Sequence, residues 1–253
     1  MCATAPPARR ERDGPARGVT EPALAEHWRA LAARYGLADA ALAQLQRAVA
    51  HMAAEVTAPT TVREPDAALD AHVADSLVAL ELEQVRAARR IADLGAGAGF
   101  PGLALGAALP AALVALVESA SRKCEYLRRV VAQARIGNVD VVHARVEEWV
   151  EGIEGQDLVV ARALGPLPVI AEYAAPLLRL GGFLVAWKGR RDGDEEERGA
   201  RAAGQLGLAM REVVPVSPFT GAEHRHLHVY EKVAPTPERF PRRPGRAASR
   251  PLA

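Results

Sequence analysis

A glycine-rich turn is the strongest chemical signal in this 253-residue sequence. Residues 91–102 read IADLGAGAGFPG, so a short apolar strand leads into Gly95, Gly97 and Gly99 before a helix begins. Glycine has no Cβ and tolerates positive φ, which lets the backbone approach a ligand closely. The N-terminus of the following helix directs free N–H groups to the same place. The pattern predicts a ligand site at the first crossover of a parallel sheet.

Two cofactor classes fit a loop of this kind. The spacing Gly97-x-Gly99-x-x-Gly102 matches the dinucleotide fingerprint. However, the Asp93 carboxylate at the strand end would repel a pyrophosphate, and Pro101 removes an N–H donor from the turn. A carboxylate suits a cofactor with an amino group and a sulfonium, so the loop favours S-adenosylmethionine. A tight turn capped by Asp93, without a ligand, is the alternative.

A carboxylate closes the next apolar strand. Glu118 ends residues 113–118. It follows the glycines by roughly 20 residues, the spacing at which an acidic side chain binds the ribose hydroxyls of a nucleoside. Because both cofactor classes contain that ribose, Glu118 supports nucleoside binding without choosing between them. An exposed glutamate that caps the next helix is the alternative.

Later strand ends carry further candidates. Val146 and Glu147 follow strand 139–143, where side chains can flank an adenine ring. Arg162 follows the apolar run 157–161, at the end of the strand where substrate and cofactor should meet. Its rigid fork of donors could position the substrate or a cofactor carboxylate. A structural role at a buried edge is equally consistent with the sequence.

The remaining polar clusters are less specific. His72, Asp75 and Ser76 share one side of a helix, because side chains three and four residues apart lie together. They could line the mouth of a pocket or pack against another helix. The histidines near the C-terminal end lack the cysteines and matching carboxylates of a metal site, so we expect no bound metal.

The elements that must position these residues alternate in type. Short aliphatic runs alternate with amphipathic segments, which predicts a doubly wound, Rossmann-like α/β fold with a largely parallel sheet and helices on both faces. A Pro- and Gly-containing turn at 217–221 indicates an antiparallel hairpin at the sheet edge. The expected strands are 90–94, 113–118, 139–143, 157–161, 182–187, 211–216 and 227–233, and the helices between the first five are 102–109, 121–135, 145–150 and 166–179.

Composition divides the chain into four parts. Residues 1–20 form a Pro- and Arg-rich basic tail that we expect to be disordered. Helical spacing, including a third helix over 67–85, predicts an N-terminal helical extension over 21–88. Residues 89–233 form the α/β domain, and residues 234–253 form a second Arg- and Pro-rich basic tail.

The net charge of +1 is unevenly distributed. Residues 1–18 carry +2 and residues 234–253 carry +4, which leaves −5 on the body between them. The basic ends could act as flexible arms on a polyanion, or they could be solvated tails without a specific role. Aromatic residues make up only 4%, so stacking platforms for single-stranded nucleic acid are scarce.

The compartment follows from cysteine content and hydropathy. Only Cys2 and Cys124 are present, which does not support a disulfide framework. No apolar run reaches the roughly 20 residues that span a bilayer, and the N-terminal residues lack the apolar segment of a signal peptide. We therefore expect a cytoplasmic protein without a membrane partner.

A wider set of motifs runs from about residue 56 to 251 and resembles one family in order and spacing. The motifs are His72-x-x-Asp75-Ser76, the loop 93–102, Glu118-Ser119-Ala120-Ser121-Arg122-Lys123, Arg145-Val146-Glu147-Glu148, Ala161-Arg162-Ala163, Trp187-Lys188-Gly189, His224-Arg225-His226-Leu227 and Phe240-Pro241-Arg242-Arg243-Pro244-Gly245. Together they resemble the glucose-inhibited division protein B family, the bacterial small-subunit rRNA guanine-N7 methyltransferases.

The resemblance implies a seven-stranded methyltransferase sheet behind a helical extension. It also implies methyl transfer from S-adenosylmethionine to N7 of a guanine in the decoding-region loop of 16S rRNA, within the small ribosomal subunit. Separately, we expect the protein to be a monomer. The positions that match the family's cofactor contacts are Gly95, Phe100, Val146, Glu147 and Arg162, with Glu118 as the ribose ligand. Candidate RNA contacts are Arg122, Lys123, Lys188 and Arg225.

The sequence departs from the family at two places on the RNA side. The usual Asn-Leu-Thr segment is replaced by residues 55–61, EVTAPTT, without the asparagine. The usual Glu-Arg-His near the last strand is EHRH at 223–226, with one extra residue. These differences concern RNA contacts more than cofactor binding.

The chemistry of N7 methylation agrees with the absence of an obvious catalytic dyad. Guanine N7 is a lone-pair nucleophile without a proton, so the reaction needs alignment at about 3–3.5 Å rather than a general base. Three other interpretations compete with this one. They are a methyltransferase for a small molecule, a nicotinamide-dependent oxidoreductase, and a non-catalytic ribosome-associated factor that kept the fold.

Overall fold

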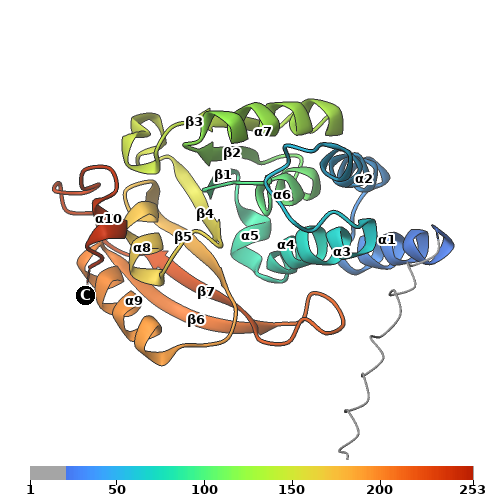
Figure 1. Ribbon diagram of the computed structural model, residues 1–253. Helices are drawn as coiled ribbons and strands as arrows, with labels where there is room; N and C mark the ends of the chain where they lie inside the picture. The colour runs from blue at the N-terminus through green and yellow to red at the C-terminus, as the bar shows by residue number, and fades with distance from the viewer. Residues whose placement is uncertain (1–20, 253) are drawn as a thin grey trace, which may run out of the picture.

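The computed structural model describes residues 21–252 as helices packed around one sheet (Figure 1). The sheet order is β3-β2-β1-β4-β5-β7-β6. The strands are β1 (Arg90–Leu94), β2 (Leu113–Glu118), β3 (Val139–His143), β4 (Gln156–Arg162), β5 (Leu178–Lys188), β6 (Leu208–Val216) and β7 (Arg225–Lys232). The first five strands pair in parallel, and β7 pairs antiparallel with both β5 and β6. The predicted doubly wound α/β fold is confirmed.

Helices cover both faces of the sheet (Figure 1). Alternate residues of β4 explain why, because successive side chains of a strand point to opposite faces. Leu158 and Val160 join the core that includes the N-terminal helices, whereas Val159 and Ala161 join the core under the later helices. The longer helices are α1 (Glu21–Tyr35), α2 (Asp39–Ala54), α6 (Gly102–Ala108), α7 (Ser121–Ala134), α8 (Leu167–Ala174) and α9 (Gly193–Gln205).

The segment expected as a third helix over 67–85 is divided into short pieces. They are α3 (Pro65–Ala68), a π-helical turn (Leu69–Ala74), α4 (Asp75–Leu77), a 3₁₀ turn (Val78–Glu81) and α5 (Glu83–Ala87). The Ser76 hydroxyl donates to the His72 carbonyl oxygen inside this segment. A side chain that bonds the preceding turn competes with the regular helix ladder. The π-turn therefore replaces the expected continuous helix.

Three other differences are local. Residues expected as a helix at 145–150 form two 3₁₀ turns, Val146–Glu148 and Val150–Gly152. The helix expected over 166–179 ends at Ala174, because β5 already begins at Leu178. The helix α9 was not predicted, because its buried residues, Gly199, Ala202 and Ala203, have helical spacing but are too small to give a strong apolar signal.

The C-terminal residues are packed rather than free. Phe240 is 8% exposed, and Arg242 pairs with Glu172 of α8. A short helix, α10 (Arg246–Ser249), follows and contacts α8. The expectation of a flexible arm is therefore wrong for residues 234–252, because buried contacts hold them in place. The other expected tail, 1–20, lies outside the described residues.

Within residues 21–252, no helix combines the length and apolar character needed to cross a membrane.

Candidate active site

The glycine loop follows β1 and requires glycine at several positions. Gly95, Gly97 and Gly99 have φ of 65°, 55° and 95°, in the region that residues with a Cβ rarely adopt. The amide of Gly95 donates to the Val117 carbonyl at 2.9 Å, which fastens the loop to β2. A Cβ on Gly95 would lie 2.6 Å from Leu164 Cδ1. Gly95 also lines a cavity, so its backbone can be approached closely by a ligand.

Asp93 lies beneath the loop. Its side chain is 1% exposed, and its Oδ2 accepts a hydrogen bond from the Gly102 amide at 2.8 Å. Burial raises the pKa of Asp93 to about 7, against the lowering effect of the Gly102 amide and Arg162. The structure thus gives Asp93 the capping geometry that the sequence left open as an alternative. It supports the N-terminus of α6 rather than facing the cavity beside the loop.

Glu118, at the end of β2, holds the other side of the loop. Its Oε2 accepts from the Gly97 amide at 3.2 Å, and its Oε1 accepts from the Ser119 and Ala120 amides at 2.9 Å. Lys123 Nζ lies 3.7 Å from Oε2. These contacts fix the carboxylate in the wall of a cavity while burying all but 6% of the residue.

A cavity of about 320 Å³ opens beside Gly95 and Glu118. Its wall comes from the ends of β1, β2, β3 and β4, where ligands bind in open parallel sheets. Sequence reasoning had identified the strand-end residues, but it missed Tyr173 of α8 and Leu164. The lining residues are Gly95, Val117, Glu118, Ser119, Lys123, Ala144, Arg145, Val146, Glu147, Ala163, Leu164 and Tyr173.

This cavity, the cofactor cavity, fits the group that the sequence predicts. The Glu118 carboxylate suits a ribose, and the apolar side of Val146 suits an adenine face. The close approach at Gly95 suits a nucleoside whose atoms must contact backbone. Phe100 is not on this wall; it is 5% exposed and stacks on His72 with ring centroids 5.4 Å apart.

A second cavity of about 410 Å³, the substrate cavity, adjoins the first through Ala163. Ala163 has φ of 55°, a left-handed conformation that is unfavourable for a residue with a Cβ. Such outliers concentrate at functional sites, where the surrounding structure imposes them. The substrate cavity is lined by Ala71, His72, Asp75, Arg162, Ala163, Gly165, Trp187, Lys188, Gly189 and Arg225.

Asp75 organises the substrate cavity. Arg162 Nη1 donates to Asp75 Oδ2 at 2.8 Å and to the Ala71 carbonyl at 2.9 Å. Arg225 Nε lies 3.3 Å from Asp75 Oδ1, and Trp187 Nε1 donates to the Asp75 carbonyl at 2.7 Å. The α4 segment is thereby joined to the ends of β4, β5 and β7.

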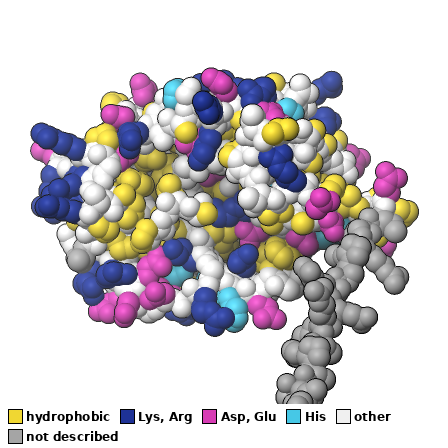
Figure 2. Space-filling model, viewed as in Figure 1, with side chains coloured by type: hydrophobic (Ala, Val, Ile, Leu, Met, Phe, Trp, Pro, Cys, Tyr) yellow, Lys and Arg dark blue, Asp and Glu magenta, His cyan; other side chains and the backbone are white. Residues whose placement is uncertain are grey.

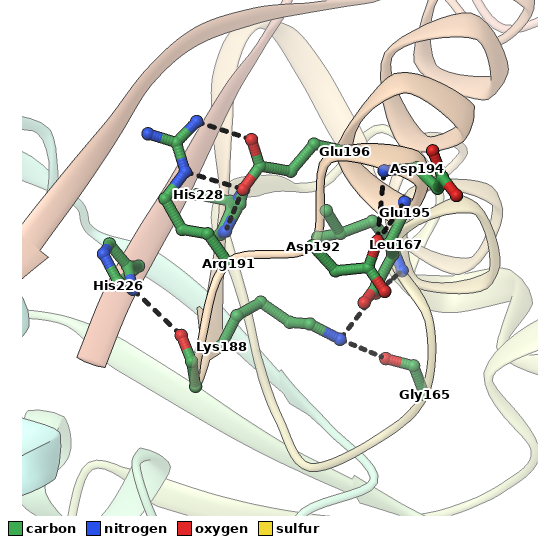
Figure 3. A network of polar contacts seen from close by, with 11 residues as sticks. Gly165, Leu167, Lys188, Arg191, Asp192, Asp194, Glu195, Glu196, His226 and His228 are labelled. Atoms are coloured by element: carbon green, nitrogen blue, oxygen red, sulfur yellow. Dashed lines mark hydrogen bonds and ion pairs between the residues drawn. The ribbon is translucent and has the colours of Figure 1, made fainter. Parts of the chain in front are cut away.

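Lys188 enters the same cavity from the end of β5 (Figure 3). Its ammonium group lies 2.6 Å from Glu195 Oε1 and donates to the Gly165 carbonyl at 3.2 Å. The Glu195 carboxylate also accepts from the Leu167 amide at 2.8 Å, and Asp192 caps the start of α9 (Figure 3). The network holds the β4–α8 loop against α9.

The substrate cavity has an excess of positive charge. Arg162, Lys188 and Arg225 line it, whereas Asp75 is its single acidic lining residue within the described chain. Burial, together with nearby Arg162, lowers the pKa of His72 to about 4, so its imidazole is neutral near pH 7. The charge balance suits an anionic substrate, and Asp75 is paired with both arginines of the cavity.

The candidate RNA contacts divide between three places. Lys188 and Arg225 lie together in the substrate cavity, as a shared role requires. Lys123 instead lies beside Glu118 in the cofactor cavity. Arg122 is exposed at the start of α7. Within residues 21–252, no group of three or more His, Cys, Asp or Glu side chains could hold a metal ion.

Solved structures with a similar fold are methyltransferases. A fibrillarin from Aeropyrum pernix in complex with S-adenosyl-L-methionine has a TM-score of 0.50 and 22% identity, covering 62% of this chain and 72% of that one. The apo S-adenosylmethionine-dependent methyltransferase SibL has a TM-score of 0.52 and 16% identity, covering 63% of this chain and 55% of that one. The chain therefore has a fold that S-adenosylmethionine-dependent methyltransferases use.

Sequence comparison narrows the class. The family model described as GidB, rRNA small subunit methyltransferase G, matches residues 40–227. Ribosomal RNA small subunit methyltransferase G of Rubrobacter xylanophilus is 44% identical over 75% of each chain. Its counterpart from Chloroflexus aggregans is 41% identical over 76% of this chain and 82% of that one. The chain belongs to the rRNA small subunit methyltransferase G family, which confirms the family resemblance.

Proposed function

We propose that this protein transfers the methyl group of S-adenosylmethionine to N7 of a guanine in the decoding-region loop of 16S rRNA. The observation that carries the proposal is the pair of adjoining cavities that meet at Ala163. One has the carboxylate and open backbone that a nucleoside needs. The other is cationic and suits a nucleotide of the RNA. The family names its members as small-subunit rRNA methyltransferases, which supports this substrate.

The residues of the cofactor cavity would bind and orient S-adenosylmethionine. We assign the ribose to Glu118, the adenine to Val146 and Glu147, and the close backbone approach to Gly95. Gly97 and Gly99 shape the loop around Gly95, and Asp93 supports the end of that loop through the Gly102 amide. S-adenosylmethionine supplies an electrophilic methyl group on a sulfonium. Phe100 does not line this cavity; it stacks on His72 and so supports the wall of the substrate cavity.

The residues of the substrate cavity position the guanine. Arg162 presents its guanidinium in the cavity and is held there by Asp75 and the Ala71 carbonyl. Lys188 and Arg225 are placed to contact phosphates or a base edge in the same cavity. Because N7 carries no proton, alignment is the main requirement, and the arginine-paired Asp75 and the weakly basic His72 agree with a reaction that needs no general base.

The proposal is tested by incubating the protein with labelled S-adenosylmethionine and small subunits that lack the modification, followed by mapping of the modified base. Label at a guanine N7 of the decoding-region loop supports it. Cofactor binding without transfer to any rRNA would favour the small-molecule alternative. We further propose that the protein acts as a monomer in the cytoplasm, without a membrane partner, which sedimentation and cell fractionation test.

A further inference from the structure

The C-terminal segment carries a concave group of arginines, here called the arginine cluster: Arg239, Arg242, Arg243 and Arg246. They line one cavity together with Pro241, and no acidic side chain is among its lining residues in the described chain. Figure 2 shows dark-blue side chains gathered at the edge of the molecule where Figure 1 draws α10 and the neighbouring loop. This surface is separate from the substrate cavity.

A buried ion pair supports the cluster from beneath. Arg242 Nε donates to Glu172 Oε1 at 2.6 Å, and the Glu172 side chain on α8 is almost fully buried. Arg242 also donates to the Arg250 carbonyl at 2.9 Å, which closes the segment on itself. Phe240 packs into the core beneath it, with the Arg239 guanidinium 5.1 Å above its ring. The cluster is therefore an ordered surface.

The other three arginines have charge available for a ligand. Arg239, Arg243 and Arg246 are exposed, and no carboxylate of residues 21–252 forms an ion pair with any of them. A guanidinium binds phosphate oxygens through two parallel N–H groups. Three such groups around one concavity match a run of phosphates better than a single carboxylate.

The cluster lies next to the cofactor cavity. The Gly245 amide, between Arg243 and Arg246, donates to Glu147 Oε1 at 2.8 Å, and Glu147 lines that cavity. RNA that reached the substrate cavity could therefore extend over the same end of the sheet. Because the body of the protein carries an excess of negative charge, a local cationic surface is needed there to attract a polyanion.

We infer that the arginine cluster binds backbone phosphates of 16S rRNA outside the nucleotide that is methylated. This inference rests on the proposed function, since it takes the same RNA as substrate. The contact is with the sugar–phosphate backbone, so it strengthens binding without selecting the base.

The test compares Arg239→Ala/Arg243→Ala/Arg246→Ala with a control triple, Arg29→Ala/Arg89→Ala/Arg128→Ala. Both variants lose three exposed arginines without ion pairs in the described chain, and both change the net charge from +1 to −2. The cluster variant should raise the KM for small subunits about tenfold and leave kcat unchanged. It should also reduce the slope of log binding constant against log salt by about two to three.

Three further measurements distinguish loss of phosphate contacts from other effects of the substitutions. Unchanged melting temperature and S-adenosylmethionine affinity exclude misfolding, and the corresponding triple lysine variant should restore most of the binding. Equal KM values and salt slopes in the cluster and control variants would overturn the inference, even if methyl transfer is normal. If the wild type methylates no rRNA but the cluster variant still binds small subunits more weakly in a filter assay, the proposed function fails and the cluster assignment stands.

Discussion

At the residue scale, Asp75 keeps two like charges together at the substrate cavity. Its carboxylate lies between Arg162 and Arg225, whose guanidinium groups would otherwise repel each other. The Arg162 side chain is only 17% exposed, so its position is defined more tightly than that of a surface arginine. A guanidinium fixed in this way can align a base at little entropic cost.

Replacing Arg162 by alanine should therefore reduce turnover about 100-fold while cofactor affinity changes by less than about twofold, because misplacement of the reacting atoms costs rate rather than cofactor contacts. Single-turnover methylation of small subunits and calorimetric titration with S-adenosylmethionine measure the two effects. Arg162→Lys is the control that keeps the charge without the fork and should recover part of the rate. Near-normal turnover of the alanine variant would show that Arg162 does not position the substrate.

Glu118→Ala should weaken S-adenosylmethionine binding about 10- to 100-fold, because hydrogen bonds to a charged group contribute about 1.5–3 kcal/mol. The variant also loses the acceptor for the Gly97 amide. Glu125→Ala is the matched control, because Glu125 is exposed on α7 and does not line the cofactor cavity. Equal affinities for both variants would show that Glu118 does not contact the cofactor.

Local patterns in the sequence identify only part of these contacts. The glycine loop and Glu118 are recognisable because each lies at a fixed distance from its own strand. The pairing of Asp75 with Arg162 joins residues 87 positions apart, and that of Trp187 with Asp75 joins residues 112 apart. Such pairs depend on the packing of α4 against the sheet end, which periodicity does not encode. Tyr173 was missed for the same reason, since it reaches the cofactor cavity from the helix after β4.

At the element scale, the crossover from β1 to α6 has no room for a side chain at its last glycine. A Cβ on Gly102 would lie 2.2 Å from Leu116 Cδ2 and 2.8 Å from Asp93 Oδ2. Gly102→Ala should reduce the free energy of unfolding by about 1–3 kcal/mol, as overpacking does, and should displace the loop enough to weaken cofactor binding. Urea unfolding and calorimetric titration measure these losses.

Gly137→Ala is the control for that substitution, because a Cβ there would meet nothing within 4 Å. Its stability should be unchanged or slightly higher, since alanine restricts the unfolded chain. If the two alanine variants were equally stable, the close packing of α6 on β2 would not be the reason for glycine at position 102.

The raised pKa of Asp93 predicts that the stability of the protein depends on pH. Burial raises its pKa to about 7, whereas an unfolded aspartate has a pKa of about 3.9. Between these values the folded protein keeps a proton that the unfolded chain has lost. The free energy of unfolding should therefore fall as pH rises from about 4 to about 7, by at most about 1.4 kcal/mol per pH unit, and then level off. Asp93→Asn keeps an acceptor for the Gly102 amide and should lack this fall.

His72 changes the free energy of unfolding with pH in the opposite direction to Asp93. Burial lowers its pKa from 6.5 to about 4, so its contribution to stability is present above pH 6.5 and is lost as pH falls toward 4. The informative quantity is therefore the difference in unfolding free energy between wild type and Asp93→Asn, measured by urea titration from pH 5 to pH 8. If this difference does not vary with pH, the pKa of Asp93 is not raised in the folded protein.

Helices and strands can be predicted from the sequence where strongly apolar residues recur at regular spacing, and the prediction fails elsewhere. The strands of the parallel sheet are continuous aliphatic runs, and their positions are close to those expected. The segment over 65–87 has good helical spacing, but its π-helical and 3₁₀ turns depend on tertiary contacts around His72 and Ser76. The charged sequence of α9 buries a stripe of glycine and alanine, which is too weakly apolar to distinguish the segment from a loop.

At the scale of the whole molecule, the C-terminal segment is stabilised by one buried pair. Glu172→Gln removes the charge that Arg242 faces, at a cost of about 1–3 kcal/mol in local stability, because Arg242 remains partly exposed. Trypsin should then cut after Arg239 or Arg246 at least about tenfold faster than in the wild type. Mass spectrometry of a limited digest identifies the sites.

Glu197→Gln serves as the control digest. Glu197 pairs with Arg201 on the exposed surface of α9, with the two side chains 72% and 50% exposed. Such a pair contributes little, so the digestion pattern should not change. Equal cutting rates after Arg246 in both variants would show that Glu172 does not hold the segment.

The strand order has a consequence for the synthesis of the protein. β7 pairs with β5 on one side and β6 on the other, although both precede it in the chain. While translation is in progress, β5 has an open hydrogen-bonding edge and β6 has no partner until β7 has left the exit tunnel. Arg225 arrives with that same strand. The nascent chain therefore completes its sheet and its substrate cavity in a single step, and this rRNA methyltransferase becomes competent only after β7 has been synthesised.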